Sequence, residues 1–160
     1  IMNKFSKLPL RKGVGIAVLN EKNEVFVAKR IDNPKNFWQM PQGGIDTGEK
    51  AIDAAYRELY EETNIKNVEL LKEVQEELTY LLPDNLLGII WKGRYKGQKQ
   101  KWYIMRFVGD EKEINIKTDN PEFLDWKWIK VEDLTNVAVS FKSHIYTHLK
   151  FEIENYLING

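Results

Sequence analysis

The sequence has no cysteine among its 160 residues and only two histidines. The absence of cysteine excludes disulfide bonds, thiolate zinc sites and a cysteine nucleophile, and it is typical of a reducing compartment such as the cytoplasm. A bound metal ion would therefore have to be held by carboxylates, histidines or carbonyl groups. We expect a cytoplasmic protein in which oxygen atoms are the main metal ligands.

Long hydrophobic runs are also missing. The longest, with glycine counted as apolar, is residues 13–19, which is far below the roughly 18 residues of a membrane span. No apolar stretch of about 7–15 residues follows the first charges, so we expect no secretory signal. The length and the 42% hydrophobic content predict a single globular domain over residues 1–160.

Neither sign of charge is in excess, because 24 basic residues balance 24 acidic ones. This balance argues against a protein that coats nucleic acid, and we expect no DNA or membrane partner. The charges are nevertheless segregated. Residues 85–109 contain six basic residues and no acid, whereas residues 43–65 contain six acids and two bases. This segregation favours divalent cations on the acidic side and an anionic substrate that meets both segments.

Strand and helix patterns alternate along the chain. Residues 13–20 and 25–30 are rich in β-branched residues around a polar turn and predict a hairpin. The spacing of alanines and Leu59 predicts a helix over residues 47–62 with Thr47 as its N-cap. A second helix is expected over residues 141–158. Further strands are expected at residues 68–77, 86–95, 102–108 and 123–129. This order predicts an α/β domain with helices packed on a sheet.

Three glutamates stand close together near the end of the first predicted helix. Glu58, Glu61 and Glu62 are related by i, i+3 and i+4, so their side chains project from one face of the helix. Three like charges at this spacing repel one another, and Mg²⁺ or Mn²⁺ would neutralise them. The alternative is an acidic helix face that is simply exposed to solvent.

The surrounding sequence, GGIDTGEKAIDAAYRELYEETNI at residues 43–65, resembles the Nudix box. The pattern is matched in register except at Asn64, where the family has glycine; asparagine is the residue that best replaces glycine in a left-handed helix end. The matching positions are Gly43, Glu49, Arg57, Glu58, Leu59, Glu61, Glu62 and Ile65. The resemblance implies an α/β/α sandwich with a mixed sheet and a C-terminal helix. It also implies that Arg57 pairs with Glu49 and holds the loop against the helix.

Four further segments resemble the bacterial RNA pyrophosphohydrolases, a Nudix subfamily also described as invasion-associated dinucleoside polyphosphate hydrolases. They are WQMPQGGIDTGE, GQKQKW at 97–102, TDNPEFLDWKWI at 118–129 and AVSFK at 138–142. The resemblance implies that Glu122 is a fourth metal-associated carboxylate. By itself, a glutamate before a strand is more often a solvent-facing charge.

The same resemblance implies a substrate site built from arginines and aromatic residues. Arg11 and Arg30 match arginines near the phosphates, and the guanidinium fork suits phosphate oxygens. Tyr80, Phe141 and Lys142 match positions at the nucleotide end, where rings can stack and an ammonium can bind phosphate. Without the resemblance, the arginines would be ordinary surface residues, and Phe141 could equally well be a core residue. The basic and aromatic residues at 91–106 fit an RNA path or a half-buried strand equally well.

Together these residues predict metal-assisted hydrolysis of a phosphoanhydride, with two or more Mg²⁺ or Mn²⁺ ions and no covalent intermediate. Glu58 and Glu62 are the candidates for the general base. The expected substrate is an RNA 5′ end or a nucleotide. Three functions remain open: an RNA 5′ pyrophosphohydrolase, a diadenosine polyphosphate hydrolase and a non-catalytic nucleotide-binding module. The complete set of carboxylates disfavours the last.

His144 and His148 have the i, i+4 spacing of zinc-protease histidines. That signature requires glutamate directly after the first histidine, where this chain has Ile145. We therefore expect ordinary histidines on a helix surface.

Overall fold

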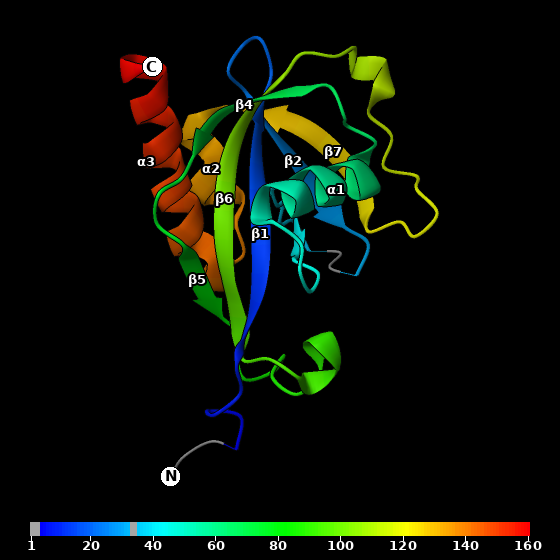
Figure 1. Ribbon diagram of the computed structural model, residues 1–160, viewed down its shortest axis with the longest axis vertical. Coiled ribbons are helices and arrows are strands. Elements are labelled where there is room, and N and C mark those ends of the chain that lie inside the picture. The colour runs from blue at the N-terminus through cyan, green and yellow to red at the C-terminus, as the bar shows by residue number, and fades with distance from the viewer. Residues whose placement is uncertain (1–3, 33–34) are drawn as a thin grey trace.

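The computed structural model describes residues 4–32 and 35–160, and within these ranges the strands form one seven-stranded sheet (Figure 1). The main path runs β4–β6–β1–β2–β7, while β3 pairs with β1 and β5 pairs with β6. β1 and β6 run parallel and the other pairs are antiparallel, so the sheet is mixed. The strands are β1 Leu10–Leu19, β2 Val25–Arg30, β3 Gln42–Gly44, β4 Val68–Glu73, β5 Leu78–Leu81, β6 Gly97–Phe107 and β7 Phe123–Ile129.

Helices cover both faces of this sheet (Figure 1). Helix α1 (Ala51–Thr63) packs on one face, and α3 (Ser143–Asn159) with the short α2 (Leu134–Val137) packs on the other. Alternate residues of β1 serve the two layers: Ile16 packs in the α1 core and Ala17 in the α3 core. A strand covered on both faces needs a nearly continuous apolar run, and residues 13–19 supply it. The expected α/β/α sandwich is confirmed.

The first helix starts later than predicted. Thr47 is not its N-cap; α1 begins at Ala51, and the N-cap, Lys50, makes no side-chain capping bond. Gly48 has φ +80°, and the Glu49 amide donates to the Asp46 carbonyl at 3.0 Å. These residues form a turn because the Glu49 carboxylate is bound by Arg57 of the helix. The other end agrees with expectation: Asn64 closes α1 in the left-handed conformation with φ 63°.

The strand predicted over residues 86–95 is wrong. This segment forms turns and a short 3₁₀ stretch at Ile90–Gly93. Trp91 and Lys92 have φ of 54° and 58°, which is incompatible with an extended strand. The apolar side chains of this segment, such as Leu86 and Ile90, pack against the α3 core without pairing as a strand.

The strand predicted over 68–77 extends too far, and β5 lies beyond it and was not predicted. The strand predicted over 102–108 is longer than expected. β4 ends at Glu73, and β5 follows at Leu78. β6 starts at Gly97 instead of residue 102, because its first half pairs with both β1 and β5. The hairpin β1–β2 and strand β7 are confirmed, and the C-terminal helix is confirmed with its start shifted to Ser143. No helix in the described ranges is long and apolar enough to cross a membrane.

Candidate active site

Arg57 of α1 joins the loop before the helix to the helix itself. Its Nε and Nη2 donate to the two carboxylate oxygens of Glu49 at 2.8 and 2.9 Å, and Nη2 also donates to the Gly44 carbonyl at 2.9 Å. The predicted pairing of Arg57 with Glu49 is confirmed. These hydrogen bonds lower the pKa of Glu49 to about 2, because they stabilise its charged form.

The same guanidinium contacts two further glutamates. Arg57 Nη1 donates to Glu58 at 2.9 Å and to Glu61 at 3.3 Å. Glu58 is the more enclosed of the two, with 16% of its side chain exposed against 57% for Glu61. Burial raises the pKa of Glu58 in spite of Arg57. Gly43 is necessary beside it, since a Cβ there would collide with the Glu58 carboxyl group.

Glu62 is in a different environment, because it is only 3% exposed and neither carboxylate oxygen has a hydrogen-bond partner. Burial raises its pKa well above the ordinary 4.5, and the charges of Glu122 and Glu58 raise it further. Glu122 reaches this place from the loop before β7, where its carbonyl accepts the Ile31 amide at 2.9 Å. A buried carboxylate beside like charges is costly unless a cation pairs with it. These oxygen donors fit a hard divalent metal ion.

The four predicted metal-associated residues are not equally close. We refer to Glu58, Glu61, Glu62 and Glu122 as the α1 carboxylate site. Glu58 interacts electrostatically with Glu61 as well as with Glu62 and Glu122, but Glu61 lies at the exposed rim beside Arg57. Within residues 4–32 and 35–160, no three members of this site bring their oxygens within 4.8 Å of one another.

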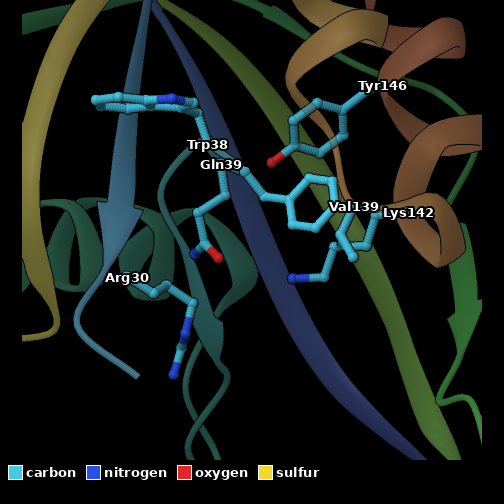
Figure 2. Close-up of a pocket in the computed structure, with 7 residues that line it drawn as sticks. Arg30, Trp38, Gln39, Val139, Lys142 and Tyr146 are labelled. Carbon is cyan, nitrogen blue, oxygen red and sulfur yellow. The ribbon is translucent and has the colours of Figure 1, made fainter. Parts of the chain in front are cut away.

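A cationic and aromatic pocket adjoins these carboxylates. Lys142 is 9% exposed, and its Nζ lies 5.0 Å from the Tyr80 ring centroid and 5.8 Å from that of Phe141. Burial, together with the charge of Arg30, lowers the pKa of Lys142 to about 7. Figure 2 shows Lys142, Gln39 and Arg30 around this pocket. The other residues lining it are Phe37, Trp38, Val139 and Tyr146.

The two predicted phosphate-binding arginines are both near enough to Tyr80 for their charges to act on it. Arg30 lines the pocket and donates twice to Asp32, at 2.8 Å each. The Arg11 guanidinium lies 5.3 Å from the Trp91 ring centroid, and Trp91 in turn neighbours Tyr80 at 6.5 Å. Arg11, Arg30 and the rings of Tyr80 and Trp91 therefore lie in one region of the structure.

Sequence reasoning missed a buried chain of glutamines on β6. Gln98 Oε1 accepts bonds from the Tyr80 hydroxyl at 3.1 Å and from Gln100 Nε2 at 2.9 Å. Gln100 Oε1 in turn accepts the Trp102 indole N–H at 3.1 Å. Gln98 Nε2 is buried without a partner, as is Gln39 Nε2. The signal was the two-residue spacing of the glutamines with Trp102, which places all three on one face of a strand.

Two lysines of the basic segment have acidic neighbours. Lys99 lies 3.7 Å from Glu77, and Lys101 lies 3.4 Å from Glu73. These acids come from the connection around β4 and β5, outside the acid-free segment. Lys99 and Lys101 form partly exposed ion pairs on β6, which favours the half-buried strand over the RNA path considered for residues 91–106.

The sandwich, the Arg57-tied loop and the glutamates of one helix define the class of Nudix proteins. The NUDIX domain family matches residues 9–149, and the chain belongs to this family. It is 63% identical over 150 residues to an RNA pyrophosphohydrolase of Pelagibacter ubique, covering 94% of this chain and 95% of the relative. It is 45% identical to an RNA pyrophosphohydrolase of Rhodospirillum rubrum, with 94% and 91% covered. Nudix hydrolases use divalent metal ions.

Solved structures show the same fold. The E. coli dihydroneopterin triphosphate pyrophosphohydrolase matches with a TM-score of 0.70 and 22% identity, covering 96% of this chain and all of the other. A C. elegans Ap4A hydrolase matches with a TM-score of 0.62 and 18% identity, covering 89% and 98%. At these identities the likeness concerns the fold alone.

Proposed function

We propose that this chain hydrolyses phosphoanhydride bonds and removes pyrophosphate from the 5′-triphosphate end of RNA, with residues 1–160 acting as one Nudix hydrolase domain. The observation that carries the proposal is Glu62. It is a buried carboxylate without a hydrogen-bond partner, it stands beside two further acids, and a pocket with Lys142 and Arg30 adjoins it. Buried anions that require a cation, next to cations that suit phosphate, are what metal-assisted phosphate chemistry needs.

The metal ligands in this proposal are Glu58, Glu61, Glu62 and Glu122, which would hold Mg²⁺ or Mn²⁺, with two or more ions when substrate is bound. Such ions would supply charge neutralisation on the phosphates and a bound water of lowered pKa. Glu58 or Glu62 would serve as the general base and accept a proton from the attacking water on a carboxylate oxygen. Glu62 has both oxygens without hydrogen bonds, whereas one Glu58 oxygen already accepts from Arg57.

The substrate end of the site divides between phosphate and base. Arg11 and Arg30 would bind phosphate oxygens, and Tyr80 with Phe141 would present rings to a base. Lys142 would add a third cation. Since its pKa is about 7, a phosphate would bind best below that value, where the ammonium is charged, and the KM would rise at higher pH.

The test compares initial rates for a triphosphate-ended oligoribonucleotide, a mononucleoside triphosphate and a diadenosine polyphosphate at matched concentrations with Mg²⁺. We expect the highest kcat/KM for the oligoribonucleotide, and we expect its advantage over the mononucleotide to shrink as salt is raised. A preference for the diadenosine compound would establish the alternative hydrolase instead. Binding of nucleotide without turnover of any substrate would indicate the non-catalytic module.

A further inference from the structure

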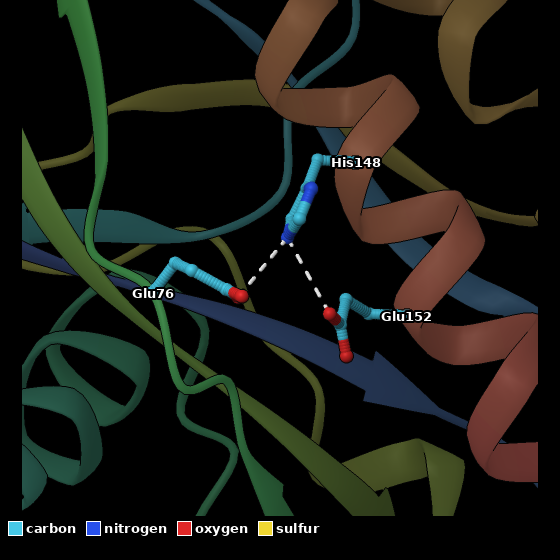
Figure 3. A group of neighbouring side chains, drawn as sticks. All are labelled: Glu76, His148 and Glu152. Carbon is cyan, nitrogen blue, oxygen red and sulfur yellow. Dashed lines mark ion pairs between the residues drawn. The ribbon is translucent and has the colours of Figure 1, made fainter.

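A second group of metal-ligating side chains lies on the opposite helix from the α1 carboxylate site. Glu76 comes from the connection between β4 and β5, and His148 and Glu152 stand one turn apart on α3 (Figure 3). In the described ranges this is the one set of three histidine or acidic residues with ligand atoms mutually within 4.8 Å. We refer to these three residues as the α3 group.

Two distances in the α3 group match the spacing of ligand atoms around a metal ion. His148 Nε2 lies 3.4 Å from Glu152 Oε1 and 3.5 Å from Glu76 Oε2. Both distances exceed the 2.7–3.2 Å of ordinary N–H···O bonds. Tetrahedral zinc with bonds of about 2.0–2.2 Å places its ligand atoms about 3.3–3.6 Å apart.

The imidazole nitrogen also lacks any other partner. His148 Nε2 is fully buried and makes no hydrogen bond, although 35% of the side chain is exposed. His148 lies on the helix surface as expected, but this one ring nitrogen is enclosed. His144, one turn earlier, differs because its Nε2 lies 2.7 Å from the Thr79 carbonyl oxygen.

The neighbouring charges leave the α3 group open to a cation. Lys72 Nζ lies 3.1 Å from Glu152 Oε2, which fixes this carboxylate and leaves Oε1 beside His148. Apart from the imidazole, the charged side chains here are two glutamates against one lysine, so the carboxylates are in excess. Glu76 is 60% exposed, so an ion can enter from solvent and keep water as a fourth ligand.

We propose that Glu76, His148 and Glu152 form a binding site for a divalent transition-metal ion of the zinc class, separate from the α1 carboxylate site. The imidazole favours zinc over Mg²⁺, which prefers oxygen ligands alone. The ion fastens α3 to the β4–β5 connection. The same helix carries Tyr146, whose hydroxyl accepts the Met40 amide at 2.7 Å and which lines the pocket beside Lys142 and Arg30.

The experiment titrates Zn²⁺ alone into the full chain after metal has been stripped with a chelator. Zinc stoichiometry and affinity are measured by competition with a chromophoric chelator, and Co²⁺ absorption reports tetrahedral coordination. The variants are His148→Gln and Glu76→Gln, with His144→Gln as the matched control and Glu62→Gln to separate zinc bound at the α1 carboxylate site. Glu76→Gln lies on an exposed turn and serves if His148→Gln fails to fold.

We expect the wild type, His144→Gln and Glu62→Gln to retain the α3 site, and His148→Gln and Glu76→Gln to lose at least about 100-fold in its affinity. Loss of an outer partner alone costs 10–100-fold, and loss of a direct ligand costs more. Zinc should also raise the Tm of His144→Gln by more than that of His148→Gln, which keeps only the α1 carboxylate site. Equal zinc stoichiometry and an equal Tm shift in His148→Gln would overturn the proposal. So would a wild type whose only zinc is lost with Glu62→Gln, which would leave the α3 group as an ion pair of protonated His148. The zinc affinity, the zinc stoichiometry and the Tm are all measured without hydrolysis, so failure of the proposed function would not affect this test.

Discussion

The α1 carboxylate site and the α3 group lie on opposite layers of the same sheet and are assembled in different ways. Glu58, Glu61 and Glu62 follow one another on a single helix, and Arg57 of that helix holds two of them. In the α3 group, helix residues meet Glu76 from a distant segment, and Lys72 holds Glu152. The first site contains oxygen donors only, and the second adds an imidazole. The comparison predicts that the two acidic groups differ in metal preference through a single nitrogen ligand.

Removal of divalent metal should have the largest effect and should separate the two sites. Treatment with EDTA is expected to abolish hydrolysis, and Mg²⁺ or Mn²⁺ should restore it, because the α1 ligands are all oxygens. His148→Gln should behave like the wild type in this assay, measured as pyrophosphate release. Full turnover after exhaustive chelation would contradict the metal-assisted mechanism.

Substitution of the buried glutamate comes next in size. Glu62→Gln keeps the shape of the side chain but removes its charge, so hydrolysis should fall by at least about 100-fold with saturating Mg²⁺. The fold should persist, as judged by circular dichroism. The matched control is Glu152→Gln in the α3 group, for which near-normal rates are expected. Near-normal turnover in Glu62→Gln would reject the site.

The basic side chains that bind the glutamates of the two groups, Arg57 and Lys72, allow a finer comparison. Arg57→Lys removes the fork that binds Glu49, Glu58 and Gly44 together, and lysine cannot replace it. We expect about a 10–100-fold fall in kcat, the usual cost of losing a partner that orients metal ligands. Lys72→Gln should leave kcat unchanged and cost at most about 1 kcal/mol of stability, since its pair is partly exposed. Equal effects of the two substitutions on kcat would contradict the distinction.

The pH dependence of metal-free stability is the smallest expected effect. Because the pKa of Glu62 is raised in the folded state, its stabilising contribution is complete below its unfolded pKa of about 4.5 and is lost as pH rises through the folded value. The urea midpoint of the metal-free wild type should therefore fall, relative to Glu62→Gln, as pH rises above about 4.5. Added Mg²⁺ should reduce this difference. A parallel pH profile for the two proteins would show that Glu62 is not the responsible group.

Patterns of neighbouring residues in the sequence predicted several helices and strands correctly. The β1–β2 hairpin, β7 and α3 follow from alternation and helical spacing, and the pairing of Arg57 with Glu49 follows from the resemblance of residues 43–65 to the Nudix box. The wrong predictions concern segments whose structure depends on contacts with residues elsewhere in the sequence. The segment around Trp91 is apolar but has no strand beside it, and its positive φ angles stop extension. The start of α1 was misplaced because Arg57 holds Glu49 in a turn instead of in the helix.

The sequence by itself determined the chemistry of the α1 carboxylate site, because its three helical glutamates and its arginine lie within a few residues of one another and a helix places them on one face. Only the tertiary structure decided that Glu62 is buried and lies beside Glu122, and that Lys99 and Lys101 are paired with acids. It alone brought His148 to Glu76. Contacts of this kind depend on which strands become neighbours in the sheet, and no spacing along the chain encodes that arrangement.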